Sequence, residues 1–372
     1  MRTIKILGAG IAGLTAAINL KNAGVDVEVH ERKTYCGKST CDFQLLENWT
    51  FEEDALEMLQ NLSIKTNFYA KPWHSLELTS PSLKTCLKKS SQPLMYLVKR
   101  GPVEDALDYA LQKQAEKINI PVIYESKLSA NDVNIIAIGR HNPNYVANGI
   151  IFSFDHPDRV IALLDDRLSF KMYAYFIVDD HIGQIVSINP AQRKDHITRF
   201  NLTVKRFEEI LNQRIGPINH RFAAAGSLHV LNRAKINHRY LIGEAAGFQD
   251  CLAGFGMMYA FKSGYHAAQS IIKDDDFDRR WQSDMLKTMR ISQVNRLLFE
   301  KLSNNGYEKL VKMLNSRNPA MMKLLGGEDL QYILKKLYNH SLSYLLRPVL
   351  YWRFLAPLYR FLLTIAGRMF FK

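Results

Sequence analysis

The residues that most constrain the fold stand near the start of the chain, where a short apolar run meets a glycine turn. Ile4-Lys5-Ile6-Leu7 has the length and composition of a buried strand, and it leads directly into Gly8-Ala9-Gly10-Ile11-Ala12-Gly13. An apolar helical pattern begins at Ile11 and ends near Gly24. Residues 25–30 alternate as a second strand, and Glu31 follows it. The order is therefore strand, tight turn, helix and strand.

Each residue type in this unit has a physical role. Gly8 permits a sharp turn, Gly10 leaves room for a pyrophosphate against bare backbone, and Gly13 lets the helix pack closely on the strand. The free N–H groups and the dipole at the start of the helix favour an anion. Glu31 can accept hydrogen bonds from both hydroxyls of an adenosine ribose, although Arg32 beside it would suit a ribose phosphate. The unit therefore predicts a dinucleotide-binding βαβ fold.

Composition and charge exclude several other classes of protein. The 372 residues are enough for two domains, and 47% apolar and 23% charged residues are ordinary for a globular protein. A net charge of +13 favours an anionic partner, such as a membrane surface or an acidic substrate. No run of Lys and Arg interleaved with aromatic residues indicates a nucleic-acid groove, so we expect no nucleic-acid partner.

Cysteine usage and the first residues favour a cytoplasmic protein. The 4 cysteines are too few for a disulfide framework and lack the spacing of zinc ligands, so we expect reduced thiols and no metal. The apolar residues at the start contain the glycine turn and are not followed by a small-residue cleavage site, so they do not predict an export signal.

The next part of the chain predicts both helices and strands. A capping box at Thr50-Phe51-Glu52-Glu53 predicts a helix from there to about Leu62. Short alternating stretches at residues 75–79 and 94–98 predict antiparallel strands. A helix is expected over residues 103–118, followed by buried strands over 121–124 and 133–138. The second of these strands ends at Gly139, as a strand that approaches a nucleotide would.

Beyond residue 150 the pattern of apolar residues changes, and after residue 240 a strand, a glycine-rich turn and a helix follow one another again. A period of two over residues 174–178 and 182–188 predicts an inserted β-sheet, followed by a helix over 204–213. A short buried strand at 240–242 then leads into the glycine-rich residues 243–256 and a helix over 257–272. From residue 274 to 341 the chain is helical in pattern.

The glycine-rich residues 243–256 indicate which dinucleotide binds. Glu244, on a turn directly after a strand, can accept a hydrogen bond from a ribityl hydroxyl. The helix that begins after Gly254-Phe255-Gly256 suits the N1/O2 edge of a flavin ring, where negative charge appears on reduction. NAD has no ribityl chain, so we predict FAD as the tightly held cofactor. We expect it to be held by Gly8, Gly10, Ile11, Ala12, Gly13, Glu31, Arg32, Gly139, Gly243, Glu244, Gly254, Phe255, Gly256 and Met257.

The predicted fold is therefore α/β, and different segments of the chain are expected to form different domains. A discontinuous Rossmann-like FAD-binding domain of the glutathione-reductase type is expected from residues 1–67, 97–150 and 236–272. An inserted antiparallel β-sheet substrate domain is expected from residues 68–96 and 151–235. A C-terminal helical region over 273–342 and an amphipathic basic and aromatic tail over 343–372 complete the chain.

With both glycine segments identified, the chain resembles the FAD-dependent oxidoreductases of the geranylgeranyl reductase and aromatic-hydroxylase superfamily, most closely the geranylgeranyl reductase-like branch. The resemblance covers about residues 1–272, and it implies that Arg100 lies against the cofactor. It is carried by Gly8-x-Gly10-x-x-Gly13 with Glu31, by Tyr96-x-Val98-x-Arg100, and by the block from Gly243 through Gly254-x-Gly256 to Ser263-Gly264.

The chain also departs from the pattern of that superfamily. The family usually has Asp where Glu244 stands, and amine-oxidase-like flavoproteins also use Glu there. The usual Pro before Gly-x-Gly is absent, because residues 249–252 read Gln-Asp-Cys-Leu. The Trp-x-Phe-Pro motif of the substrate sheet is not found either, and residues 173–177 occupy that region. These departures leave the FAD prediction intact and the substrate open.

One candidate for a direct role in catalysis follows from the same resemblance, and the others follow from the residues themselves. Cys41 lies one residue away from the place where prenyl reductases carry a cysteine beside the flavin, so it is either catalytic or a small buried hydrophobe. Tyr175, with Tyr173 on the same face of a strand, either lines a flavin-facing cavity or belongs to the sheet core. Residues 42–49 form a polar and aromatic cluster directly after the cofactor loop, which is either functional or a capped helix with an aromatic anchor.

The resemblance implies a flavoenzyme that moves a hydride or electron pair between the flavin and a hydrophobic substrate, isoprenoid or lipid-like. Its electron donor would be NAD(P)H or a reduced carrier protein. One alternative is an NAD(P)H-dependent flavin monooxygenase that hydroxylates an aromatic or polyketide-like compound. Another is a non-catalytic protein of the membrane surface, stabilised by FAD.

The tail, residues 343–372, has no acid and is rich in Leu, Tyr, Phe and Trp. Arginines recur along it at Arg347, Arg353, Arg360 and Arg368. Its uncharged stretches are shorter than the roughly 20 residues that a spanning helix needs. Aromatic rings beside arginines suit the lipid headgroup boundary, so we expect peripheral contact with the inner face of a membrane. The alternative is a C-terminal helix that packs on the protein itself.

Overall fold

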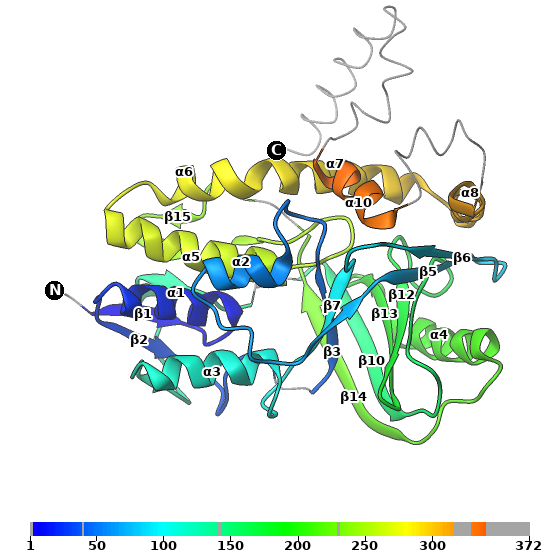
Figure 1. The fold of residues 1–372 in the computed structure, drawn as a ribbon, viewed down its shortest axis with the longest axis horizontal. Helices are drawn as coiled ribbons and strands as arrows, with labels where there is room; N and C mark the ends of the chain where they lie inside the picture. The colour runs from blue at the N-terminus through cyan, green and yellow to red at the C-terminus, as the bar shows by residue number, and fades with distance from the viewer. Residues whose placement is uncertain (1–2, 39–40, 140–142, 229–230, 316–328, 340–372) are drawn as a thin grey trace, which may run out of the picture.

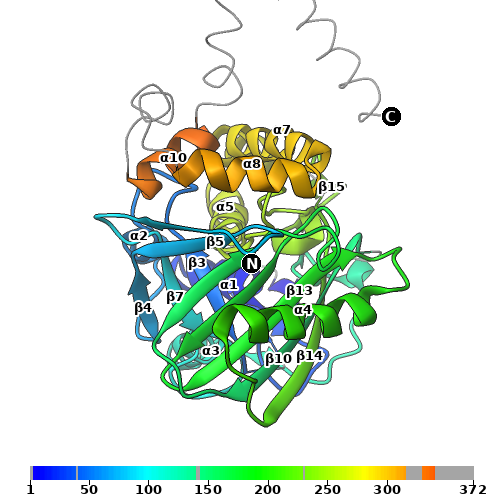
Figure 2. The same cartoon turned by 90° about the vertical axis from the view of Figure 1, so that its right-hand side faces the viewer.

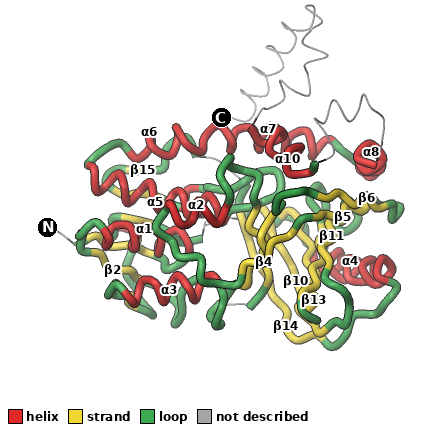
Figure 3. The backbone as a smooth tube through the Cα atoms, in the orientation of Figure 1, coloured by secondary structure: helices red, strands yellow, loops and turns green. Residues whose placement is uncertain are grey.

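The computed structural model describes residues 3–38, 41–139, 143–228, 231–315 and 329–339. Helices gather at one end of the molecule and long strands at the other (Figures 1 and 3). The C-terminal helices form a layer along one side of both parts (Figure 1), and they stay on that side in the view turned by 90° (Figure 2). The predicted α/β class, with a Rossmann-like sheet, an additional β-sheet part and C-terminal helices, is therefore confirmed.

A six-stranded sheet contains the first glycine turn, and its strand order is β15-β16-β9-β1-β2-β8. The inner strands pair in parallel, as a Rossmann-like sheet requires, and β15 adds an antiparallel edge. The strands are β1 (Ile4–Leu7), β2 (Val27–His30), β8 (Val122–Ile123), β9 (Ile135–Ile136), β15 (Lys235–Ile236) and β16 (Arg239–Leu241). The short strands β9 and β16 bring residues from the middle of the chain beside β1.

Three helices pack together on this sheet: α1 (Ile11–Asn22), α3 (Leu107–Lys117) and α5 (Met257–Lys273). Helix α1 contacts both α3 and α5. The contact between α1 and α5 is so close that a Cβ added at Gly264 would lie 2.4 Å from the carbonyl oxygen of Ala12. A glycine at position 264 is therefore required by packing. The close contact between α1 and α5 brings the two glycine-rich segments, which are far apart in the sequence, together in space.

The strand-rich end is a seven-stranded sheet of order β14-β10-β13-β12-β11-β5-β6. Neighbouring strands are antiparallel except for the pair β11 and β5. Helix α4 (His196–Leu211) covers one face, where Phe200 and Phe207 join a core with Phe152 and Phe176. The strands are β5 (Ser75–Thr79), β6 (Thr85–Lys89), β10 (Tyr145–Ser153), β11 (Arg159–Leu163), β12 (Ala174–Asp179), β13 (Ile182–Pro190) and β14 (Ile218–Gly226).

A small antiparallel sheet of order β3-β7-β4 connects the two parts. It consists of β3 (Phe43–Glu47), β7 (Met95–Lys99) and β4 (Ala70–Trp73). Phe43 and Leu97 share a core with Ile177 of β12 in the larger sheet, and Leu330 and Tyr338 of α10 (Leu330–Asn339) complete that core. One apolar region therefore joins the small sheet, the large sheet and the C-terminal helices.

The C-terminal helices are held by polar contacts to distant loops. A continuous helical run comprises α6 (Phe277–Trp281), a π-helical turn (Gln282–Leu286) and α7 (Lys287–Lys301), and α8 (Asn304–Asn315) follows it. In α8, Glu308 Oε1 accepts a hydrogen bond from the backbone N–H of Ser82 at 2.7 Å. Ahead of α10, Asp329 Oδ2 accepts one from the backbone N–H of Ser91 at 2.9 Å. The helical region is therefore part of the folded core.

Several boundaries differ from the predicted ones. The predicted capping box at Thr50 is wrong, because Asp54 is the N-cap of α2 (Ala55–Asn61). Its carboxylate accepts the backbone N–H of Leu56 at 2.9 Å. Thr50 is buried and lies three residues after the end of β3. The sequence pattern did not predict this strand. Helices α3 and α4 begin at Leu107 and His196, not at residues 103 and 204, and β14 was also not predicted. Pairing with distant strands decides β3 and β14, and local patterns do not record such pairing.

Among the described residues, no helix combines the length and apolar character that crossing a bilayer requires. The predicted amphipathic tail, residues 343–372, lies outside the described residues.

Candidate functional site

The first glycine turn leaves an open space in front of α1. Gly8 has a φ of +107°, and a Cβ added there would lie 2.6 Å from the carbonyl oxygen of Ala137. A Cβ at Gly13 would lie 2.0 Å from the carbonyl oxygen of Gly8. A Cβ at Gly10, in contrast, would meet no atom within 4 Å. Gly8 and Gly13 are thus required by packing, whereas Gly10 borders the space in which a phosphate group would fit.

Glu31 joins the end of β2 to this turn. Its Oε2 accepts the backbone N–H of Ala9 at 2.9 Å, and its Oε1 accepts that of Lys33 at 3.0 Å. The side chain is buried, whereas Arg32 is exposed. Because each carboxylate oxygen can accept more than one hydrogen bond, Glu31 keeps capacity for ribose hydroxyls.

Arg100 lies beside the same turn, in a buried network with Asp108. Its Nε and Nη2 donate to the two carboxylate oxygens of Asp108 at 2.8 and 2.9 Å, and its Nη1 donates to Gln44 Oε1. Burial alone would raise the pKa of Asp108, but the Arg100 guanidinium outweighs it and holds that pKa below its usual range. Asp108 in turn packs against Gly37, where an added Cβ would lie 2.0 Å from Asp108 Oδ1.

This network reaches the glycine turn through the loop after β2. The backbone N–H of Gly37 donates to the carbonyl oxygen of Ala9 at 2.9 Å. Arg100 is therefore connected to the turn through this loop, and its nitrogens bond Asp108 and Gln44. In this arrangement Arg100 positions the loop that borders the turn.

The second glycine segment meets the first at the start of α1. Gly243 has a φ of +59°, and a Cβ added there would lie 2.9 Å from Cβ of Ala12. The carboxylate of Glu244 lies between Gly139, in the loop after β9, and Gly226, at the end of β14: a Cβ at Gly139 would be 3.7 Å from its Oε2 and one at Gly226 would be 3.9 Å from its Oε1. The structure thus brings Gly139, Gly243 and Glu244 together beside the glycine turn.

The helices that begin at these turns have no side-chain cap. Gly10 is the N-cap of α1 and Gly256 that of α5, and neither helix has an acidic residue in its first turn. Gly254 before α5 has a φ of +82°. Free N–H groups at both helix starts, the space at Gly10 and the two placed carboxylates fit a dinucleotide that has phosphate and polyol groups. The residues present therefore fit FAD.

The predicted catalytic candidates have different environments. Cys41 is exposed, and partial burial together with the Asp42 carboxylate raises the pKa of its thiol, which disfavours the thiolate. Tyr175 packs against the core of the small sheet, its ring centroid 6.1 Å from that of Tyr173. Burial raises the pKa of the Tyr175 hydroxyl, and Gln184 Nε2 lies 3.5 Å from it.

A buried polar cluster contains Glu47 and Trp49 of the segment 42–49, which the sequence left as either functional or structural. Glu47, at the end of β3, is 1% exposed, and within the described part of the chain neither of its carboxylate oxygens has a hydrogen-bond partner. Burial, assisted by the charge of Asp250, raises the pKa of Glu47 to about 8. Trp49 Nε1, Thr50 Oγ1 and the Tyr259 hydroxyl are likewise buried without a partner there. The sequence did not connect Tyr259, which lies in α5, with this segment.

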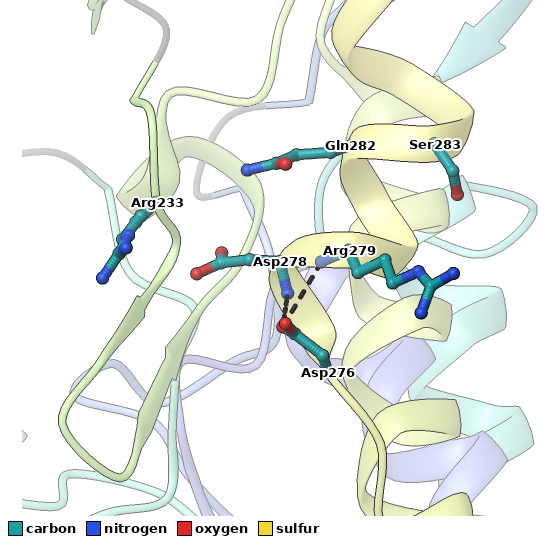
Figure 4. A pocket seen from close by; sticks show the side chains of 6 residues that line it. All are labelled: Arg233, Asp276, Asp278, Arg279, Gln282 and Ser283. Atoms are coloured by element: carbon teal, nitrogen blue, oxygen red, sulfur yellow. Dashed lines mark hydrogen bonds between the residues drawn. The ribbon is translucent and has the colours of Figure 1, made fainter.

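Two surface cavities lie at other residues. One, of about 650 Å³, is lined by Arg233, Asp276, Asp278, Arg279, Gln282 and Ser283 (Figure 4). Its acids have structural partners: Asp276 accepts the backbone N–H of Asp278 at 2.9 Å, and Asp278 accepts that of Ala234 at 2.7 Å. The other, of about 850 Å³, includes Lys71, whose ammonium is bound by Asp158 and Asp179. Neither cavity contains a predicted site residue.

The chain has a Rossmann-like fold with an added β-sheet part, and its glycine turns fit a dinucleotide. Residues 6–52 match the family described as NAD(P)-binding Rossmann-like domain. No curated protein matches the chain in sequence.

Several solved structures share the fold of nearly the whole chain. A geranylgeranyl bacteriochlorophyll reductase-like protein from Thermoplasma acidophilum is 16% identical, with a TM-score of 0.72, and the match covers 94% of this chain and 99% of that one. A p-nitrophenol 4-monooxygenase from Pseudomonas putida is 12% identical, with a TM-score of 0.62 and coverage of 92% and 98%. A probable FAD-dependent monooxygenase from Pseudomonas aeruginosa is 12% identical, with a TM-score of 0.60 and coverage of 84% and 100%. The predicted resemblance in fold is therefore confirmed.

Proposed function

We propose that this protein is an FAD-dependent oxidoreductase that acts on a hydrophobic substrate. The observation that carries the proposal is the meeting of two glycine turns, each with an acid, at the start of α1. Glu31 bonds the turn at Ala9, and Glu244 lies between Gly139 and Gly226. One acid would bind the adenosine ribose and the other the ribityl chain, while Gly10 leaves room for the pyrophosphate.

The roles of the chain's own residues follow from their contacts. Backbone N–H groups at the start of α1 would bind the pyrophosphate, and those of residues 254–257 would favour negative charge at the ring edge. Arg100 and Asp108 hold the loop containing Gly37 against the glycine turn. When bound, the flavin would supply transfer of a hydride or an electron pair. The protein would supply binding, orientation and exclusion of water.

The apolar region beside the second turn supports a hydrophobic substrate. Phe255, in that turn, packs edge-to-face on Trp49 with ring centroids 5.2 Å apart. Tyr175, Leu252 and Leu334 border the same core, which α10 covers. Aromatic and aliphatic side chains of this kind favour an isoprenoid or aromatic compound. The similarity in fold to a geranylgeranyl bacteriochlorophyll reductase-like protein supports the isoprenoid class.

A flavin monooxygenase is the second candidate function. It is favoured by the similarity in fold to the p-nitrophenol 4-monooxygenase and to the probable FAD-dependent monooxygenase. The aromatic surroundings of Trp49 and Phe255 would equally suit an aromatic ring. In both functions the electrons would come from NAD(P)H or, for the reductase, from a reduced carrier protein. A non-catalytic role for a bound flavin is the third candidate.

Flavin reduction and reoxidation separate these functions. The purified protein should contain FAD that acid or heat releases unmodified, and NADH, NADPH or dithionite should bleach its absorbance. A monooxygenase should consume oxygen in proportion to a hydroxylated aromatic product. A reductase should transfer its electrons to an isoprenoid alkene in the absence of oxygen. A flavin that none of these reductants bleaches would favour the non-catalytic role, and a protein that binds no FAD would refute the proposal.

A further inference from the structure

Polar groups without partners gather at the end of β3, and we call the set Glu47, Trp49, Thr50 and Tyr259 the β3 cluster. Within the part of the chain that the structure describes, none of their terminal polar atoms has a hydrogen-bond partner, and all are buried. Leaving a buried polar group unbonded costs about 1–3 kcal/mol. Such groups are rare in folded proteins, and several in one place indicate an absent hydrogen-bonding molecule.

The β3 cluster lies beside the second glycine turn. Tyr259 belongs to the first turn of α5, which begins at Met257 directly after Gly256. Burial raises the pKa of the Tyr259 hydroxyl well above its usual range, and the charges of Asp250 and Glu47 add to the rise, which places these acids near it. Trp49 packs on Phe255 of the turn itself. The cluster therefore borders the place where the proposed function puts the flavin ring and its substrate.

The two acids in this region differ in their hydrogen bonding. Asp250 accepts the backbone N–H groups of Leu252 and Ala253 at 3.1 and 2.6 Å and the hydroxyl of Tyr338 at 3.2 Å. Glu47 accepts none of these donors. A carboxylate that receives several close donors keeps its charge more easily than one that receives fewer, so a proton on this pair resides on Glu47. Glu47 is then an uncharged acid that can donate a hydrogen bond.

The remaining members of the β3 cluster identify the chemistry of the missing partner. The indole of Trp49 can only donate, and the hydroxyls of Thr50 and Tyr259 each offer a donor. A protonated Glu47 adds another donor. A cationic group would face these donors unfavourably, whereas a carbonyl oxygen can accept two hydrogen bonds. The surrounding aromatic side chains favour a carbonyl that belongs to a flat, conjugated molecule.

We propose that the β3 cluster binds the carbonyl edge of a conjugated ring, by donating hydrogen bonds to its oxygen. This inference rests on the proposed function, because the ring is either the flavin itself or a substrate with an enone or quinone group. Both sources share the same chemistry, and binding experiments distinguish them.

Conservative variants remove the donors and preserve most of the volume: Glu47→Gln, Trp49→Phe, Thr50→Val and Tyr259→Phe. Tyr307→Phe is the matched control, because Tyr307 is also fully buried but lies in α8, where its hydroxyl donates to Asp166 at 3.1 Å. FAD binding is measured by titration of the apoprotein. Binding of menadione, methylnaphthalene and naphthylmethylamine is measured by calorimetry, which requires no flavin signal.

If the flavin is the ligand, Trp49→Phe and Tyr259→Phe should weaken FAD binding about tenfold each, the effect of losing one hydrogen bond. If the substrate is the ligand, FAD binding should stay unchanged, menadione binding should weaken about tenfold, and methylnaphthalene binding should not change. Tyr307→Phe should change neither.

Either of two results would overturn the proposal. Variants that bind FAD and menadione as the wild type does would show that the cluster holds only ordered water. Naphthylmethylamine that binds more tightly than menadione, and loses this advantage in Glu47→Gln, would show a cation site instead. Failure of the proposed function has a different signature, since the wild-type protein would then bind no FAD at all while menadione binding still reports on the cluster.

Discussion

The side chain of Gln184 takes the place of a neighbouring strand for Phe43. Gln184 Oε1 accepts the backbone N–H of Phe43 at 2.8 Å, and Gln184 Nε2 donates to the carbonyl oxygen of the same residue at 3.0 Å. Gln184 is fully buried in β13 of the large sheet, and Phe43 begins β3 of the small sheet. One amide group therefore satisfies both backbone groups of a residue that leads from the cofactor loop towards Glu47.

This contact predicts a large effect of Gln184→Leu on stability. The variant leaves a buried N–H and a buried carbonyl group of Phe43 without partners, which should lower the free energy of unfolding by about 1–3 kcal/mol. Urea denaturation followed by tryptophan fluorescence measures the change. Gln112→Leu is the control, because the hydrogen bond from Gln112 to Glu116 is exposed and its loss should cost less than about 0.5 kcal/mol. Equal losses in the two variants would contradict a bridging role for Gln184.

Substitutions in the first glycine turn should separate cofactor binding from folding. Gly10→Val should abolish FAD binding and leave the apoprotein folded, because a side chain there enters open space in the structure and would occupy the place of the pyrophosphate. Gly13→Val should impair folding itself, since its Cβ would collide with the carbonyl oxygen of Gly8. Flavin absorbance after gel filtration and far-ultraviolet circular dichroism measure the two properties. Undiminished flavin in folded Gly10→Val would argue against a dinucleotide at this turn.

Shortening and removing the acid at Glu244 should have graded effects on the cofactor. Glu244→Ala should weaken FAD binding by about 1.5–3 kcal/mol, roughly ten- to a hundredfold, because a charged acceptor of a ribityl hydroxyl is lost. Glu244→Asp should weaken binding less, because the carboxylate remains. Fluorescence titration of the apoproteins with FAD provides the dissociation constants. Identical constants for wild type and both variants would show that Glu244 does not bind the cofactor.

The buried acid Glu47 should make stability depend on pH. Its pKa is raised in the folded protein, from 4.5 to about 8, so between these values the folded state holds a proton that the unfolded state has lost. Its contribution is therefore fully present below pH 4.5 and is lost as pH rises to about 8. Glu47→Gln removes this dependence. The variant should gain stability relative to wild type as pH rises from 5 to 8, on the order of a few kcal/mol.

Urea denaturation of both proteins across this pH range tests the prediction. The difference between them isolates Glu47 from Asp250, whose pKa burial also raises. A difference that stays constant with pH would show that Glu47 is ionised in the folded protein at neutral pH.

The tail, residues 343–372, gives a prediction that rests on the sequence. Anionic liposomes should co-sediment the full chain at low salt, and binding should weaken as salt rises, because arginines meet lipid headgroups. Removal of residues 343–372 should leave a folded protein with its FAD that no longer sediments. Loss of folding on truncation, together with a full-length chain that ignores liposomes, would favour the packed C-terminal helix.

Local sequence was sufficient for the Rossmann-like unit, because its requirements lie between near neighbours. Gly13 and Glu31 are dictated by contacts within one strand-turn-helix-strand segment, and Gly8 by the positive φ of its turn, although its closest approach is to Ala137 from a distant part of the chain. The turn at residues 243–256 could also be predicted from the sequence, because a strand, an acid and a helix that begins after a glycine follow one another directly.

Tertiary structure alone decided the environment of Glu47. Read locally, residues 42–49 suit either a functional loop or a capped helix, and nothing nearby in the chain states that β7 will pair with them. Once β3 forms, Asp250 from the second glycine segment, Tyr259 from α5 and Tyr338 from α10 surround its end. The burial and pKa of a side chain depend on groups that are close in space and far apart in sequence. For this reason the local sequence predicted the two glycine turns but not the burial of Glu47 beside the second one.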